Sequence, residues 1–93
     1  MLFRSSRTLH EETAFDRARV TSVDWASYPV LRFTEAPAVE VVLIDRPEVP
    51  LVGAGEAATA PVAAALANAI FDATGARLRR VPFTAARVKS ALA

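Results

Sequence analysis

The stretch from residue 52 to residue 75 constrains the fold more than any other part of the chain, because it predicts a glycine loop that runs directly into an alanine-rich helix. Gly53 and Gly55 bracket a turn of small residues, and glycine allows positive φ and a close backbone approach to a neighbour or ligand. Glu56 follows at once and is the single charged residue in the segment 50–71. Two interpretations of Glu56 stay open: a solvated loop residue that helps to cap the helix, or a positioned base or ligand-facing carboxylate.

The predicted helix has a recognisable beginning and end. Thr59 is an N-cap candidate, and Pro61 suits the first turn because its missing N–H would be unpaired there in any case. Gly75 is placed to end the helix. Apolar residues recur at helical spacing between these signals and predict one apolar stripe, formed by Val62, Leu66, Ala69, Ile70 and Ala73.

The composition predicts one small domain, residues 1–93, with an apolar content of 53% that is high for its size. Two explanations stay open: an alanine-rich core, or apolar surface that is buried against another protein. The absence of cysteine excludes disulfides, thiolate metal ligands and cysteine nucleophiles. Because His10 is the one histidine, the sequence predicts no metal site within this chain.

Several classes of protein are disfavoured by what the sequence lacks. A net charge of +1 provides no electrostatic case for binding nucleic acid. No segment approaches the roughly 18 apolar residues of a membrane-spanning helix, so we expect no membrane span. Residues 1–15 do not resemble a signal peptide, which favours a cytoplasmic protein. A single histidine, with no serine in a G-x-S-x-G setting, provides no basis for a catalytic triad.

The first quarter of the chain predicts a β-hairpin. Residues 1–7 have little pattern and are expected to fray. Residues 8–15 and 19–25 alternate apolar with polar side chains, and the segment 16–18 between them is typical of a turn.

Further strands and a last helix are predicted beyond the hairpin. The clearest strand is 39–44, because its residues are β-branched or apolar on both faces except at Glu40, as in an inner strand. Residues 77–83 predict a short strand, and Thr84 is placed to cap a helix over 85–92. Together these elements predict an α+β fold, a small antiparallel or mixed sheet with two helices packed on it.

Read together, these segments resemble one protein family. The most specific motif is the loop followed by the helix and its exit, namely Gly53-Ala54-Gly55-Glu56, Ala60-Pro61-Val62, Ala67-Asn68-Ala69-Ile70-Phe71 and Ala73-Thr74-Gly75. Residues 19–93 are similar to the extreme C-terminal part of the molybdopterin-binding subunit of the xanthine dehydrogenase and aldehyde oxidoreductase family. Within it they most resemble the branch of bacterial isoquinoline 1-oxidoreductase and nicotinate dehydrogenase type enzymes. Residues 1–18 match more weakly.

The resemblance implies a catalytic role for Glu56 and a cofactor contact for Gly53 and Gly55. In the family, the glutamate after this loop is the base beside the molybdenum. It takes the proton from the hydroxyl that attacks a carbon of an aldehyde or N-heterocycle. Glu56 fits this role, because a carboxylate on a constrained loop in an apolar setting can accept a proton near neutral pH. Many family members have prolines soon after this glutamate, where this chain has Ala57 and Ala58, which indicates a looser loop.

The size of the chain limits what it does alone. Family subunits are several hundred residues long, and 93 residues cannot enclose a molybdopterin and its metal. The resemblance therefore implies a fragment of a larger molybdenum-binding domain, inactive alone and without a cofactor of its own. Its implied partners are a larger molybdopterin-binding subunit, with the cofactor in the cytosine dinucleotide form, and an iron–sulfur subunit. The alternative is a non-enzymatic truncated remnant that forms a small self-associating domain, a homo-oligomer.

Overall fold

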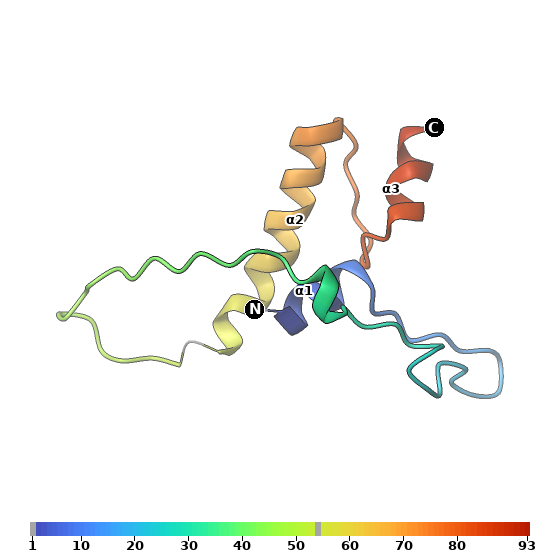
Figure 1. Cartoon of the computed structure of the whole chain (residues 1–93), viewed down its shortest axis with the longest axis horizontal. Helices are drawn as coiled ribbons and strands as arrows, with labels where there is room; N and C mark the ends of the chain where they lie inside the picture. Colours follow the sequence, from blue (N-terminus) through green and yellow to red (C-terminus); the bar gives the residue numbers. More distant parts are fainter. Residues whose placement is uncertain (1, 54) are drawn as a thin grey trace.

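The computed structural model describes residues 2–53 and 55–93, in which three α-helices are joined by long irregular segments (Figure 1). The helices are α1 (Leu2–Leu9), α2 (Thr59–Thr74) and α3 (Ala85–Leu92). Two short 3-10 helices, η1 (Phe33–Glu35) and η2 (Glu56–Ala58), complete the regular structure of this part. Met1, at the start of the segment expected to fray, and Ala54 of the glycine motif lie outside the described residues.

The described residues form no β-sheet, so the predicted α+β fold is wrong. The segment 39–44, predicted as the clearest strand, has no neighbouring strand, and Leu43 and Ile44 are 89% and 80% exposed. The strand predicted over 77–83 is irregular. The physical reason is that β-propensity expresses how well side chains pack on cross-strand and same-face neighbours. This part of the chain supplies no such neighbours.

The predicted hairpin is reduced to its turn. Phe15 and a residue five positions later, Val20, form an isolated antiparallel bridge. Between them the Asp16 carboxylate accepts hydrogen bonds from the backbone N–H groups of Ala18 at 2.7 Å and Arg19 at 2.9 Å, which lowers the pKa of Asp16. An isolated two-stranded hairpin is marginal in water. Because Phe15 is 77% exposed, no packing extends the pairing beyond this bridge.

The N-terminal residues form α1, where we predicted a frayed end followed by a strand. This helix packs against α2 and lies across its lower part in Figure 1. Among the side chains of α1 that the structure describes, the buried ones are polar. Ser6 Oγ accepts a hydrogen bond from the backbone N–H of Leu31 at 2.9 Å, and Arg4 Nε donates to Thr59 Oγ1 of α2 at 3.0 Å. The hydrogen bonds that dock this helix join residues at least 25 positions apart, so the N-terminal segment alone does not predict them.

The helix predicted after the glycine loop is present as α2. Gly75 ends it in the left-handed conformation, with φ 74°, and its N–H donates to the Phe71 carbonyl at 2.7 Å. Thr59 is the first helical residue and not the N-cap, which is Ala58. The predicted stripe is only half covered: its branched members Val62, Leu66 and Ile70 are half-buried, whereas Ala69 and Ala73 are exposed.

The C-terminal helix α3 also agrees with prediction. Thr84 caps it, because its hydroxyl oxygen accepts a hydrogen bond from the backbone N–H of Arg87 at 3.3 Å. In the described part of the chain, none of the helices is both long and apolar enough to cross a membrane.

The chain buries little of its apolar content. Among the side chains that the structure describes, the buried apolar ones are Phe83, at 6% exposure, and its neighbour Pro82. The accessible surface is 7809 Å², against roughly 5,200 Å² for a compact monomer of this mass. The radius of gyration is 16.3 Å, against about 12 Å for a compact domain of this length. Of the two explanations of the apolar composition, the structure therefore disfavours an alanine-rich core, because most apolar surface of the described residues is left open.

Glu12 connects the N-terminal and C-terminal segments. Its carboxylate accepts hydrogen bonds from the guanidinium groups of Arg87 at 2.6 Å and Arg80 at 3.1 Å. The bond from Arg87 is the largest cause of a lowered pKa at Glu12, and Arg80 adds to it less strongly. Because the folded-state pKa is depressed, this contact stabilises the fold above the ordinary glutamate pKa. The stabilisation is lost as pH falls through the folded value.

We expect Arg87→Gln to raise the pKa of Glu12 toward 4.5, and Arg80→Gln to raise it by a smaller amount. The reason is that Arg87 contributes the shorter hydrogen bond and the larger part of the shift. Carboxyl-carbon NMR titration of the full chain measures both variants. Equal rises in the two variants, or no rise in either, would contradict these pairings.

Candidate functional site

Glu56 lies where the glycine loop becomes helical backbone. It is the first residue of η2, and the backbone N–H of Thr59 donates to its carbonyl, so η2 continues directly into α2. The N–H groups of a first helical turn lack partners and carry partial positive charge, which favours a carboxylate at this position. The Glu56 side chain is exposed, and within the described chain it makes no hydrogen bond or ion pair.

The surroundings of Glu56 are more open than the resemblance implies. The implied setting is apolar and poor in water, whereas Gly53, Gly55 and Glu56 are all exposed. The apolar stripe of the following helix is not covered by a sheet either, since the described residues form none. Within the described chain the Glu56 side chain is therefore uncovered, and the apolar face of α2 beside it is only half covered.

Arg4 contacts the chain on both sides of Glu56, at one backbone carbonyl and one side-chain hydroxyl. Its Nη2 donates to the Gly55 carbonyl, and its Nε donates to Thr59 Oγ1 at 3.0 Å. The guanidinium lies 4.6 Å from the centroid of the Phe3 ring, and the residue is only 7% exposed. A planar guanidinium can serve two acceptors at once in this way. Sequence reasoning missed Arg4, because it is 51 residues from Gly55 and lies in a segment expected to fray.

Neither Gly53 nor Gly55 has the positive φ that would require glycine. Gly55 has φ −73°, and Gly75 is the one described glycine with positive φ. A Cβ atom added at Gly53 would meet nothing within 4 Å, and one added at Gly55 would meet only Arg4 Nη2 at 4.0 Å. A requirement for glycine at these positions would therefore come from a group outside the described residues.

The described residues around Glu56 do not by themselves fit a bound cofactor. Space is open at the loop, so a pterin would find no enclosing wall there. Across residues 2–53 and 55–93, no group of three or more His, Cys, Asp or Glu side chains could hold a metal ion. Any cofactor at this loop would need its binding groups from another protein surface.

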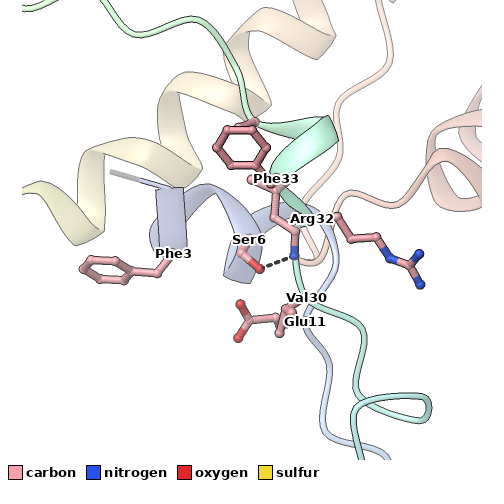
Figure 2. Close-up of a pocket in the computed structure, with 8 residues that line it drawn as sticks. Phe3, Ser6, Glu11, Val30, Arg32 and Phe33 are labelled. Carbon is pink, nitrogen blue, oxygen red and sulfur yellow. Dashed lines mark hydrogen bonds between the residues drawn. The ribbon is translucent and has the colours of Figure 1, made fainter.

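A surface pocket of about 260 Å³ lies between α1 and the segment that contains η1 (Figure 2). Its charged residues are Glu11 and Arg32, and the Arg32 side chain points away from Glu11 in Figure 2. Tyr28 Oη donates to the Glu11 carboxylate at 2.9 Å, which raises the pKa of Tyr28. Glu56 does not line this pocket, so it is separate from the predicted site and presents no acid–base pair.

The resemblance predicted from the loop and helix motif is confirmed by sequence comparison, because the chain is homologous to segments of a dehydrogenase subunit and of a second dehydrogenase. Over 88 residues, 95% of its length, it is 50% identical to a subunit of the nicotinate dehydrogenase of Pseudomonas putida. Over 87 residues it is 33% identical to the membrane-bound aldehyde dehydrogenase (pyrroloquinoline-quinone) of Gluconacetobacter polyoxogenes. The chain spans only 7% and 11% of the lengths of these two proteins. No protein-family profile and no solved structure matches it.

Proposed function

We propose that this chain completes a larger molybdopterin-binding subunit of an oxidoreductase and supplies Glu56 as the base in the oxidation of an aldehyde or N-heterocycle. The observation that carries the proposal is the 50% identity to the nicotinate dehydrogenase subunit over 95% of the chain. Because the matched segment is 7% of that protein, the proposed activity belongs to the assembly and not to the chain alone.

The open surface of the chain supports a larger partner. Its accessible area of 7809 Å² exceeds the roughly 5,200 Å² of a compact monomer of its mass. A second protein surface that covers this excess would also enclose Glu56, which is exposed here. Exclusion of water strengthens electrostatic interactions within a site and lets a carboxylate take up a proton more readily.

The residues of this chain have distinct proposed roles. The cofactor held by the larger subunit supplies the redox chemistry. Glu56 accepts a proton, and Arg4 is a positioning residue because it holds the Gly55 carbonyl and the Thr59 hydroxyl on either side of it. Gly53 and Gly55 leave the loop without side chains that would keep a partner surface away.

The test is complementation of a truncated relative. Nicotinate dehydrogenase of Pseudomonas putida is prepared with its homologous subunit shortened to remove the segment matched by this chain, and the full 93-residue chain is co-expressed with it. We expect the chain to copurify with the truncated subunit and to restore nicotinate oxidation above the level without the chain. Failure to copurify, or copurification without any gain in turnover, would overturn the proposed function.

A second candidate function is favoured by the same open apolar surface. A non-enzymatic remnant would cover its exposed residues by self-association, without a larger subunit. Size-exclusion chromatography with light scattering distinguishes the two candidates. A stable homodimer with no affinity for the truncated subunit would favour the remnant, whereas a free chain that is recruited by that subunit would favour the oxidoreductase segment.

A further inference from the structure

We propose that the extended segment 39–44 is an unpaired β-strand that completes a sheet of the larger oxidoreductase subunit and becomes an interior strand there, paired on both sides. The inference rests on the proposed function, because it assigns the surface through which the chain contacts that subunit. It concerns a segment that we predicted as a strand and that has no strand partner in the described chain.

The segment 39–44 begins beside α2 and ends at a turn. Near its start, Pro37 and Val39 border a small pocket with Val62 and Leu66 of α2. Beyond this point the chain projects from the helices as a long loop, coloured green in Figure 1. A turn follows at 46–49, where the Val49 N–H donates to the Arg46 carbonyl at 3.1 Å and Arg46 forms an ion pair with Glu48.

The backbone and side chains of the segment are both open. In the part of the chain that the structure describes, no backbone group of residues 39–44 takes part in a hydrogen bond. Four consecutive apolar side chains in it are strongly exposed: Val41 at 73%, Val42 at 77%, Leu43 at 89% and Ile44 at 80%. A run of this kind is a template for main-chain pairing with a sheet edge, in which the backbone provides affinity and alternate side chains provide specificity.

The alternation of side chains favours a large sheet over a second copy of the chain. In an extended strand Val41 and Leu43 share one face while Val42 and Ile44 share the other, so both faces are apolar. Two copies would pair along one edge and leave both faces in water, and such a two-stranded ribbon is marginal. A larger subunit can offer a sheet edge with apolar layers on both sides.

Charge disfavours a parallel pairing of two copies of this segment. Glu40 and Asp45 are the charged residues of the segment 37–45, which contains no lysine or arginine. A second copy aligned in parallel would therefore place like charges opposite each other, which is destabilising. We expect the partner strand to carry a basic residue opposite Glu40. Because residues 50–55 lead from the turn to Glu56, this pairing would also fix the path into the glycine loop.

The experiment uses the full chain with the truncated nicotinate dehydrogenase subunit. Val42→Pro removes a backbone donor and cannot enter a central strand, whereas Val42→Ile keeps the donor and the branched side chain. We expect Val42→Pro to weaken binding to the truncated subunit by about tenfold or more, and Val42→Ile to leave it unchanged. Hydrogen exchange should be fast at the amides of 40–44 in the free chain and strongly slowed in the complex. The helical circular dichroism of the free variants should match that of the parent, because Val42 lies outside the helices.

The outcomes separate this inference from the proposed function. Normal binding by Val42→Pro, with restored turnover and fast exchange at 40–44, would overturn the strand and leave the function standing. Slowed exchange and sensitivity to Val42→Pro without any turnover would keep the strand and overturn the function. Absence of binding would overturn both. If hydrogen exchange at 40–44 slows as the concentration of the free chain rises, the segment pairs with a second copy of the chain. That result would reject pairing with a sheet of the larger subunit.

Discussion

Glu56→Gln is expected to lower kcat of the complemented oxidoreductase by about 10²- to 10⁴-fold, the usual contribution of a general base. Glutamine has nearly the same shape as glutamate but cannot take up the proton. The Glu56 side chain has no hydrogen-bond or ion-pair partner in the described chain, so the substitution should not disturb the fold. Steady-state kinetics with nicotinate measures kcat, and copurification with the truncated subunit measures assembly.

Asp72→Asn is the matched control for this prediction. It makes the same change from carboxylate to amide at another exposed position, on α2 and away from the loop. We expect it to assemble and turn over like the parent chain. Full turnover with Glu56→Gln would remove the base from the proposal, and equal losses in the two variants would show that the effect comes from charge in general.

Arg4→Met is expected to weaken the docking of α1 on the loop and on α2 by about 3 kcal/mol, because a charged donor contributes roughly 1.5–3 kcal/mol per hydrogen bond. Methionine keeps much of the length of the side chain but donates nothing to the Gly55 carbonyl or to Thr59 Oγ1. Since Arg4 is only 7% exposed, little of this loss is recovered from water. Amide hydrogen exchange along α1, followed in the free chain, measures the change.

Arg7→Met provides the comparison on the same helix. Arg7 is exposed, and its guanidinium lies 5.9 Å from the Phe3 ring centroid, so its loss should change exchange along α1 only slightly. In the complemented enzyme, Arg4→Met should lower turnover and be accompanied by shifted amide resonances at Gly55 and Thr59. If amide hydrogen exchange along α1 is the same in Arg4→Met and Arg7→Met, the contacts of Arg4 do not stabilise the docking of α1.

These two substitutions address different parts of one arrangement. Glu56 has the proposed chemistry but no partner of its own in the described chain, and Arg4 has partners on both sides of Glu56 but no proposed chemistry. We expect Glu56→Gln to lower turnover while α1 stays docked, and Arg4→Met to loosen the docking of α1. This pair of results would identify Glu56 as a catalytic residue and Arg4 as a positioning residue.

Several features could be predicted from the sequence because they depend on a few neighbouring residues. Gly75 ends α2 and Thr84 caps α3, since each cap is decided within about one helical turn. The turn at 16–18 is similar, because Asp16 reaches backbone groups only two and three residues away. The loop and helix motif also predicted the relationship to a dehydrogenase subunit, which the 50% identity over 95% of the chain confirms.

Only the tertiary structure decided the rest, because the interactions responsible join distant residues. The contact between Arg4 and Gly55 spans 51 positions, and the Ser6 hydroxyl of α1 bonds the Leu31 N–H 25 positions away. The sheet was wrong for a related reason: the segment 39–44 has the composition of a strand, but a strand exists only where another strand pairs with it. Sequence by itself determined the local preferences of this chain, whereas the spatial arrangement decided which of them found a partner. The physical reason is that secondary-structure preference depends on neighbouring residues, whereas hydrogen bonds between strands, or between residues 51 positions apart, depend on how the chain folds.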